Sequence, residues 1–271
     1  MSDMPVSNAV RKVVKESEEV RTIFLEDNVP GAIPGQFVMV WLPGLDEKPY
    51  ALSYMDGEAA VTVQRRGKFT DEIFKLKKGD YIGVGGPCGN GFDVDTCKRP
   101  CIIAGGIGIA PLAPLAEKLA RKKPVIIMGA ATKEKLIFRE RMEKVCKVEH
   151  TTDDGSCGRK CFASDILEEV IEKCRVGVVY GCGPEMMLKR VFEICRKNRV
   201  ECQLSLERYM HCGLGVCGSC AVDGYRVCVD GPVFSSKQLE KMSEFGKFAR
   251  LKYGTKVGRS EYYEWREEVI A

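Results

Sequence analysis

The sequence predicts an antiparallel β-barrel, then an α/β domain with a doubly wound parallel sheet, then a small cysteine-rich module. Short β-prone runs, separated by turns rich in Gly, Pro and Asp, fill the first hundred residues, as they do in small barrels. From Pro100 onward, apolar strands alternate with stretches whose apolar residues recur at helical spacing, which indicates βαβ units. Four cysteines follow within residues 212–228, where the regular pattern has ended.

The barrel is expected to occupy residues 1–98. Its predicted strands, each bounded by turn residues, are Val20–Leu25, Gln36–Leu42, Ala60–Gln64 and Tyr81–Val84. The pattern changes after Lys98-Arg99-Pro100, and we place the domain boundary there.

The α/β domain is expected to occupy residues 99–206. The predicted strands are Cys101–Ala104, Val125–Met128, Val148–Thr151, Gly177–Tyr180 and Val200–Leu206. The predicted helices are a first one through Leu112–Leu119, then Leu136–Val145, Ser164–Cys174 with Ser164 as its cap, and Glu185–Arg196. Ligands bind at the carboxyl ends of the strands in such sheets. Residues 207–234 form the expected cysteine module, and residues 235–271 a charged, weakly periodic C-terminal extension.

Composition excludes several classes of protein. The chain of 271 residues is 45% hydrophobic and 30% charged, as is usual for a globular protein. A net charge of +4 with dispersed basic residues gives no indication of nucleic-acid binding. The sequence lacks an apolar run long enough for a membrane span and does not begin as a signal peptide does, so we expect a cytoplasmic protein. Without a secretory signal, its 14 cysteines favour metal binding or burial over disulfides.

The most specific motif is Cys212-x4-Cys217-x2-Cys220, followed by Cys228. Thiolates at this spacing match the plant-type loop around a [2Fe–2S] cluster, and the interleaved glycines allow the backbone to approach the sulfurs closely. A structural zinc site is the alternative, although zinc usually takes two well-separated Cys hooks. His211 adjoins the first cysteine and is interpreted as a bystander.

Two glycine-rich turns follow predicted strands. Gly105-Gly106-x-Gly108 precedes Ala110-Pro111 at the start of a helix, an arrangement that suits the pyrophosphate of a dinucleotide. Gly181-Cys182-Gly183-Pro184 ends a later strand, and its cysteine could lie against a reacting ring. Each turn is also compatible with a simple tight connection.

Two segments of the barrel could bind a phosphate-bearing ligand. Lys48-Pro49-Tyr50-Ala51-Leu52-Ser53 offers a cation, an aromatic ring and a backbone, and is also compatible with an ordinary strand. Gly67-Lys68-Phe69-Thr70 could begin a helix whose N–H groups and hydroxyl meet a phosphate. The run from Gly85 to Phe92 is too rich in glycine for regular structure and is expected to form a shaped loop.

The order of these segments resembles the ferredoxin–NADP reductase superfamily, over nearly the whole chain. Within it, Thr152-Asp153-Asp154-Gly155-Ser156 and Gly89-Asn90-Gly91-Phe92 are most similar to the family of electron-transfer subunits of NAD-dependent dihydroorotate dehydrogenase. The resemblance implies an FAD-binding barrel, a nucleotide domain for NAD and a terminal [2Fe–2S] module. It assigns FAD to Lys48, Pro49, Tyr50, Ala51, Leu52, Gly67 and Thr70, NAD to Gly105, Gly106, Gly108 and Gly183, the hydride path to Cys182, and the cluster to Cys212, Cys217, Cys220 and Cys228.

Two departures bear on the flavin site. The family usually has Arg where Lys48 stands and Ser or Thr where Ala51 stands. Lysine binds phosphate as a point charge rather than with a bidentate fork, and alanine offers no hydroxyl. Cys228 also follows sooner than is usual, which suggests a shortened cluster loop.

The resemblance implies an oxidoreductase subunit of pyrimidine biosynthesis. An FMN-containing catalytic partner, in a heterotetramer, would oxidise dihydroorotate, and electrons would pass through the cluster and FAD to NAD. Met210, Leu214 and Val216 could form the contact surface, or could pack inward. The alternatives are a flavin subunit of another complex, such as a hydrogenase or an NADPH–ferredoxin oxidoreductase, and a zinc-stabilised binding module. Lys133 and Glu134 leave NAD and NADP both open.

Overall fold

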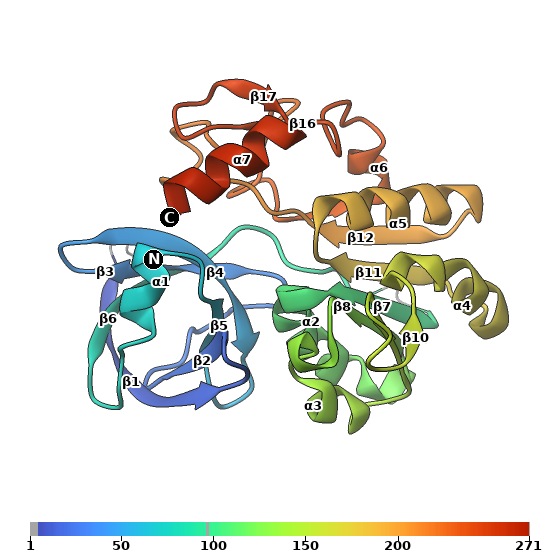
Figure 1. Ribbon diagram of the computed structural model, residues 1–271, viewed down its shortest axis with the longest axis horizontal. Helices are drawn as coiled ribbons and strands as arrows, with labels where there is room; N and C mark the ends of the chain where they lie inside the picture. Colours follow the sequence, from blue (N-terminus) through green and yellow to red (C-terminus); the bar gives the residue numbers. More distant parts are fainter. Residues whose placement is uncertain (1–4, 96–97, 271) are drawn as a thin grey trace.

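Six strands of the N-terminal part form a closed barrel in the computed structural model, which describes residues 5–95 and 98–270 (Figure 1). Their order around the barrel is β1-β2-β5-β4-β3-β6. The strands are β1 (Val6–Lys15), β2 (Val20–Leu25), β3 (Phe37–Leu42), β4 (Asp46–Tyr54), β5 (Ala60–Gln64) and β6 (Tyr81–Cys88). A short helix, α1 (Lys68–Ile73), follows β5.

Apolar side chains at alternating positions along the strands fill the core of the barrel. Val38 and Val40 of β3 are fully buried there with Ile23, Val61 and Ile82 from neighbouring strands. Each fully buried aliphatic side chain of this kind contributes about 1.5–3 kcal/mol to folding. The antiparallel barrel is therefore the fold that the sequence predicts.

The second part is a seven-stranded sheet in the order β10-β9-β8-β7-β11-β12-β15, parallel except for β15. The strands are β7 (Pro100–Gly105), β8 (Val125–Ala130), β9 (Val148–Thr152), β10 (Arg159–Lys160), β11 (Val178–Cys182), β12 (Glu201–Ser205) and β15 (Val233–Ser235). The helices are η1 (Gly106–Gly108), α2 (Ile109–Lys118), η2 (Ala120–Lys122), η3 (Lys133–Lys135), α3 (Arg139–Glu143), η4 (Ala163–Asp165), α4 (Leu167–Cys174) and α5 (Glu185–Lys197).

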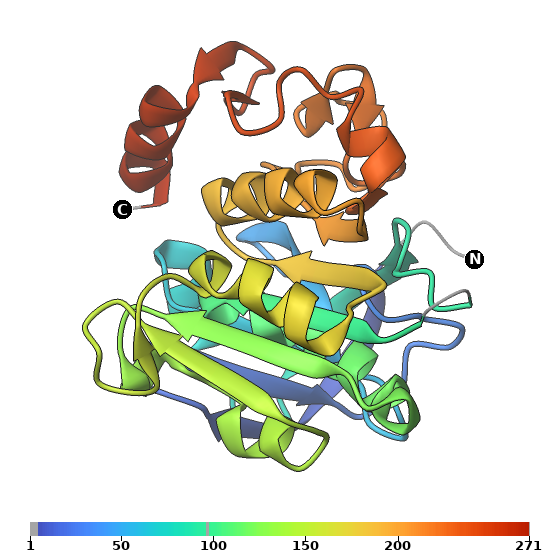
Figure 2. The ribbon, with the colours of Figure 1, turned by 90° about the vertical axis from the view of Figure 1, so that its right-hand side faces the viewer.

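Helices cover both faces of this sheet (Figure 2). The apolar faces of α4 and α5 pack on one side in a single buried cluster, and those of α2 and α3 pack on the other. The doubly wound arrangement confirms the predicted fold class.

The rest of the chain forms small elements above these two parts (Figure 1). They are β13 (Ala221–Val222), β14 (Tyr225–Arg226), α6 (Ser236–Leu239), β16 (Phe248–Arg250), β17 (Lys256–Gly258) and α7 (Arg259–Ile270). β15 pairs antiparallel with β12, so the cysteine module is joined to the edge of the α/β sheet.

Two helix predictions differ from the structure. The helix expected over Leu136–Val145 is only Arg139–Glu143, because Phe138 at its start has a φ of 59° and interrupts the α-helix. Ser164 does not cap a helix: it lies inside η4, and Asp165 accepts the N–H of Phe162 instead.

Arg141 of α3 fastens the α/β domain to the barrel. Its guanidinium makes two 2.8 Å hydrogen bonds to Glu117 of α2 and donates at 2.8 Å to the carbonyl of Ser53 in β4. It also lies 3.6 Å from the ring centroid of Tyr54. A bidentate Arg–carboxylate pair of this kind fixes geometry as well as adding energy, so the two domains meet in a defined orientation.

Among the residues that the structure describes, there is no helix both long and apolar enough to cross a membrane.

Candidate functional site

The two glycine-rich turns of the α/β domain meet at the carboxyl ends of neighbouring strands. β7 and β11 pair in parallel, with Ala104 opposite Cys182. A Cβ atom on Gly108 would collide with the backbone of Cys182, and one on Gly183 would lie 2.9 Å from the Cα of Gly105. Only glycine permits so close an approach. The structure thus brings together the residues that the sequence predicts for the nicotinamide nucleotide.

Gly106 forms the open side of this junction. Its φ is 54°, and a Cβ atom there would meet nothing within 4 Å. α2 begins directly afterwards at Ile109, so the positive end of a ten-residue helix lies beside an accessible glycine backbone. These two features are what a dinucleotide pyrophosphate requires, and the residues fit a nicotinamide dinucleotide.

Cys182 is a neutral thiol in this setting. Burial raises its pKa to about 12, the negative charge of Glu207 adds to that effect, and the Ser205 hydroxyl opposes it. A thiol with this pKa is not a nucleophile at neutral pH. Any role of Cys182 beside a nicotinamide is therefore one of contact and shape.

The flavin motif lies on β4, against α1. Tyr50 stacks on Phe69 of α1, with ring centroids 6.3 Å apart and planes inclined by 18°. Burial raises the pKa of Tyr50, so its phenol stays protonated. Leu52 is fully buried in the barrel core and holds the strand in place. The structure therefore brings β4 and the start of α1 together, as FAD binding requires.

The Thr70 hydroxyl has a different role from the expected one. It accepts the N–H groups of Arg66 and Gly67 at 2.8 and 2.9 Å, and it donates to the carbonyl of Gly67 at 2.7 Å. These bonds shape the turn before α1 and occupy the hydroxyl. Positive charge beside the turn comes from the exposed side chains of Arg66 and Lys68.

Lys48 is paired within its own hairpin. Its Nζ lies 2.6 Å from Oδ2 of Asp46 and 5.5 Å from the ring centroid of Tyr209, in the link to the cysteine module. Burial opposes ionisation of Asp46, but the contacts with Lys48 and with the N–H of Glu47 lower its pKa. To bind a phosphate, the Lys48 ammonium group must give up its ion pair with Asp46. Together with Tyr50 and the basic turn, Lys48 is compatible with the phosphate and ring groups of FAD.

The four cysteines form two pairs. The sulfurs of Cys220 and Cys228 are 3.4 Å apart. Cys212 is faced by the thiol and the backbone N–H of Cys217. Each iron of a [2Fe–2S] cluster binds two protein ligands, so two facing pairs match its ligand set. Within the described part of the chain, no three Cys, His, Asp or Glu side chains lie close enough together to hold one metal ion.

Backbone N–H groups favour the thiolate form in this loop. Burial opposes ionisation of Cys212, but the N–H groups of Cys217, Leu214 and Val216 lower its pKa to about 7. The neighbouring Cys228 thiol lowers the pKa of Cys220 to about 6, and the same contact raises that of Cys228. Iron binds thiolates, and N–H groups aimed at sulfur stabilise them, so the loop fits an iron–sulfur cluster.

The glycine-rich loop at the end of β6 holds the cysteine module. Asn90 donates to the carbonyls of Val229 and Asp230 at 3.2 and 3.0 Å. A Cβ atom on Gly89 would lie 2.5 Å from the carbonyl oxygen of Gly231. The prediction of a shaped loop over Gly85–Phe92 is wrong for Gly85–Cys88, which belong to β6 because they pair with β3. The residues after Cys88 form the loop, and they are a contact of the barrel with the segment that follows the last cysteine.

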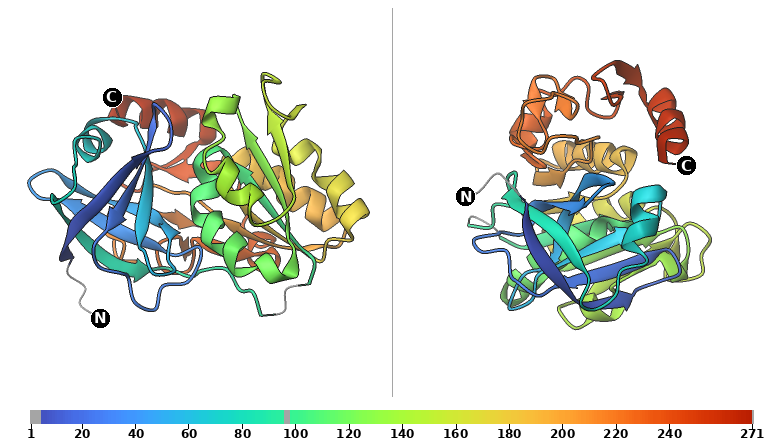
Figure 3. Two further views of the ribbon diagram at one scale, coloured as in Figure 1. Left: turned by 90° about the horizontal axis from the view of Figure 1, so that it is seen from below. Right: turned by 90° about the vertical axis from the view of Figure 1, so that its left-hand side faces the viewer.

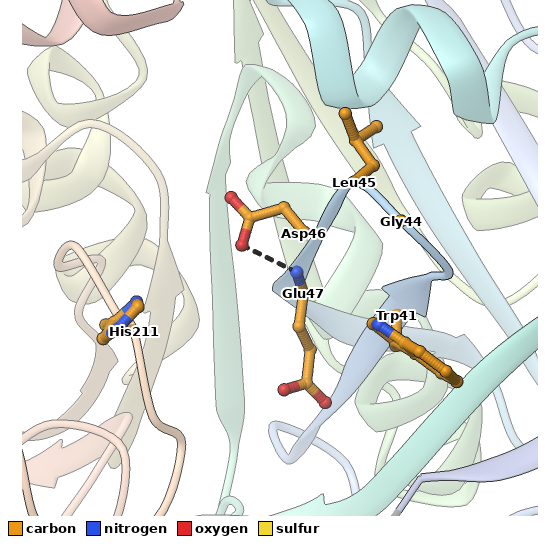
Figure 4. Close-up of a pocket in the computed structure, with 6 residues that line it drawn as sticks. All are labelled: Trp41, Gly44, Leu45, Asp46, Glu47 and His211. Carbon is orange, nitrogen blue, oxygen red and sulfur yellow. Dashed lines mark hydrogen bonds between the residues drawn. The ribbon is translucent and has the colours of Figure 1, made fainter.

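An open hollow of about 520 Å³ separates the β3–β4 hairpin from the cysteine loop (Figure 4). It is lined by Trp41, Gly44, Leu45, Asp46, Glu47 and His211. The exposed His211 faces it from the cysteine side. The predicted site residues do not line it, although Lys48 is paired with Asp46 on its rim.

A buried ion cluster, which the sequence does not predict, lies next to the nicotinamide turn. Glu185, the first residue of α5, accepts hydrogen bonds from both terminal nitrogens of Arg208, one of them at 2.8 Å. Arg259 of α7 lies 3.0 Å from the same carboxylate, and the N–H of Gly246 donates to it at 2.7 Å. The side chains of Arg208 and Glu185 are only 2% and 10% exposed. These partners are far apart in the sequence, so no local pattern could reveal them.

Two family models match the chain. Residues 207–240 match the iron–sulfur cluster binding domain of dihydroorotate dehydrogenase B, and residues 102–193 match the oxidoreductase NAD-binding domain. The first match contains all four paired cysteines, and the second contains the two glycine-rich turns.

Curated relatives align over most of the chain. The probable electron transfer subunit of dihydroorotate dehydrogenase B (NAD(+)) from Methanocaldococcus jannaschii is 42% identical over 259 residues, covering 94% of this chain and 99% of that protein. The corresponding protein from Pyrococcus furiosus is 48% identical over 222 residues, covering 82% and 86%.

Solved structures share the fold. A chain of the NADH-dependent reduced ferredoxin-NADP oxidoreductase superposes with a TM-score of 0.79 at 28% identity, covering 97% of this chain and 96% of that one. A ferredoxin NADP+ reductase from Neisseria gonorrhoeae superposes with a TM-score of 0.61 at 17% identity, covering 73% and 92%, which shows the fold alone. The ferredoxin-reductase-like architecture that the sequence predicts is thereby confirmed.

Proposed function

Because the chain belongs to the family of electron transfer subunits of dihydroorotate dehydrogenase B, we propose that it relays electrons between a catalytic partner subunit and NAD. The relay uses an iron–sulfur cluster and FAD as its resident groups. One observation carries this proposal: the cysteine loop is fastened both to the barrel, through Asn90, and to the α/β sheet, through β15.

A flavin exchanges two electrons as a hydride with a nicotinamide and single electrons with an iron–sulfur cluster. The side chains of this chain bind and orient these groups. The backbone at Gly106 and the start of α2 receive the dinucleotide, and Cys182 and Gly183 border its ring. Tyr50 and Lys48 hold FAD, and the two cysteine pairs supply four thiolates with N–H groups directed at them.

We assign dihydroorotate oxidation to the partner subunit, which carries FMN on this proposal, and we place the complex as a heterotetramer in the cytoplasm. Cys182, the thiol in the nicotinamide turn, is neutral because burial raises its pKa, so it is not suited to act as the base for dihydroorotate. The partner would contact the exposed part of the cysteine loop, where Leu214 and Val216 are 55% and 83% exposed.

A second candidate is the flavin subunit of an NADH-dependent reduced ferredoxin-NADP oxidoreductase. It is favoured by the superposition that covers 97% of this chain with a TM-score of 0.79. The two candidates differ in the partner and in the nucleotide. Reduction of NADP by reduced ferredoxin would support the second, and NAD reduction by dihydroorotate would support the first.

The test begins with the chain purified anaerobically. We expect two irons and two sulfides per chain, a flavin spectrum, and NADH oxidation with an artificial acceptor. Dihydroorotate oxidation should appear only after the FMN-bearing partner is added. Cys217→Ser should abolish the cluster spectrum, whereas Cys174→Ser, at an exposed cysteine outside the loop, should leave it intact. One zinc per chain at full occupancy, without flavin, would refute the proposal.

A further inference from the structure

The C-terminal extension wraps around the cysteine module. Arg250 donates through Nε to the carbonyl of Ala221 at 3.2 Å, and the hydroxyl of Ser219 donates to the carbonyl of Lys252 at 3.2 Å. Glu244 receives the N–H of Asp223 at 3.2 Å, and its own N–H donates to the Asp223 carboxylate at 2.6 Å. The β16–β17 hairpin is thereby anchored, and it fixes the point from which α7 starts.

Two acidic residues of the α/β domain and its link hold α7. Arg259, in its first turn, pairs with the buried Glu185 at 3.0 Å. Arg266, in its last part, pairs with Glu207, and this charge raises the pKa of Arg266. Since Glu185 and Glu207 follow the carboxyl ends of β11 and β12, α7 is attached to the edge of the sheet where the nucleotide turns lie.

Aromatic side chains connect α7 to the flavin motif. Trp265 packs edge-on against Tyr209, with ring centroids 5.5 Å apart, and against the buried Tyr262 at 5.8 Å. The same Tyr209 ring has its centroid 5.5 Å from Nζ of Lys48. A movement of α7 would therefore be transmitted to Lys48 through the ring of Tyr209.

The path of α7 agrees with these contacts. It runs from the hairpin above the α/β sheet down to the barrel, and its C-terminal end lies beside α1 in each of the views (Figures 1 and 3). It therefore reaches the barrel on the side of α1, the helix whose Phe69 stacks on Tyr50 of the flavin motif.

We propose that α7 is an additional part of the FAD site, a strap across its open side, with Glu185 and Glu207 as the positioning residues that hold it. The inference rests on the proposed FAD site and goes beyond it, because the extension after residue 240 lies outside both family models. The strap slows the release of FAD and keeps Tyr209 against Lys48.

The test measures FAD release from the full-length chain, by the recovery of flavin fluorescence after dilution. Arg259→Gln removes the strap's first contact and leaves Glu185 paired with Arg208. Glu207→Gln removes the second contact. Glu264→Gln, at an exposed position of the same helix, is the matched control. We expect about two- to fivefold faster release for Glu207→Gln, whose ion pair with Arg266 is partly exposed, a larger increase for Arg259→Gln, whose pair with Glu185 is nearly buried, and no change for the control.

Exchanging the two charged residues of the second ion pair shows whether the loss of that pair, rather than a general destabilisation of the chain, accelerates FAD release. Glu207→Arg combined with Arg266→Glu should restore the wild-type release rate, while either change alone should accelerate release. Iron and sulfide content should stay constant throughout. Unchanged release in the Arg259→Gln/Glu207→Gln double variant, or a parallel loss of FAD and cluster, would overturn the strap. A wild-type chain that takes up no FAD would overturn the proposed function as well.

Discussion

At the scale of single residues, the flavin site differs most from its expected chemistry. The resemblance assigns Lys48 to the phosphates of FAD, and in the structure Lys48 is paired with Asp46 at 2.6 Å. The Thr70 hydroxyl is likewise occupied by its own turn. Neither hydrogen-bond partner could be inferred from the sequence. The apolar pattern of a strand predicts which face of the sheet a side chain lies on, but not which neighbouring residue it bonds to.

Lys48→Ala should weaken FAD binding by about 1–3 kcal/mol, the range for a lost charge-assisted hydrogen bond. Asp46→Asn should have the opposite effect, because it frees Lys48 for the phosphate. Titration of the apoprotein with FAD gives both dissociation constants. Equal affinities in the wild type and Lys48→Ala would show that Lys48 is not a phosphate ligand.

At the scale of elements, prediction succeeded where the pattern was local. β2 and β5 span the predicted residues, and the cysteine spacing indicated the loop that the structure folds into two pairs. β1 was missed because charged residues such as Arg11 and Lys12 interrupt its apolar alternation. α7 was missed because its attachment depends on Glu185 and Glu207, which are distant in the sequence.

The two alternatives that the sequence leaves open for Met210, Leu214 and Val216, exposure at a contact surface or inward packing, divide among the three residues. Leu214 and Val216 are exposed, but Met210 is 7% exposed and packs in the core between the cysteine module and the α/β domain. The sequence could not distinguish the buried residue from the exposed ones, because apolar residues in an irregular loop do not recur at a regular spacing that would indicate a buried face.

The loop between β6 and the α/β domain allows a matched glycine test. Gly89 and Gly57 have φ values of 69° and 73°, but only at Gly89 would an added methyl group meet another segment, the carbonyl of Gly231 at 2.5 Å. Gly57→Ala should cost about 1 kcal/mol of stability from its backbone conformation alone. Gly89→Ala should cost about 2–4 kcal/mol, because the cysteine module must also shift.

Thermal unfolding and the half-life of the cluster absorbance measure these two effects separately. We expect the cluster to be lost faster only in Gly89→Ala. Equal cluster lifetimes in the two variants would mean that this loop does not hold the module.

At the scale of the whole molecule, the three sites lie in one continuous body. Arg141 joins the two domains, Asn90 joins the barrel to the module, and β15 joins the module to the sheet. Leu214 and Val216 lie on an exposed side of the cysteine loop. Relative positions of this kind follow from contacts between distant segments, so only the structure could supply them.

Leu214→Asp and Val216→Asp should impair partner-dependent turnover and leave NADH oxidation and the cluster spectrum unchanged. A buried, unpaired charge at the interface should raise the Kd for the partner at least about tenfold. Phe162→Asp, at a 60% exposed position of the α/β domain, is the control. If turnover with the partner is retained in both loop variants, or falls together with NADH oxidation, the cysteine loop is not the docking surface.

The antiparallel pairing of β15 with β12 has a consequence for maturation of the chain. β12 would end the sheet if β15 were not paired along Gln203–Ser205. A bare sheet edge is a template for strands of other chains, and self-association through such edges leads to aggregation. In a newly made chain the edge of β12 stays exposed until β15 has paired with it, so folding of the segment that follows the cysteines and self-association compete for the same molecule.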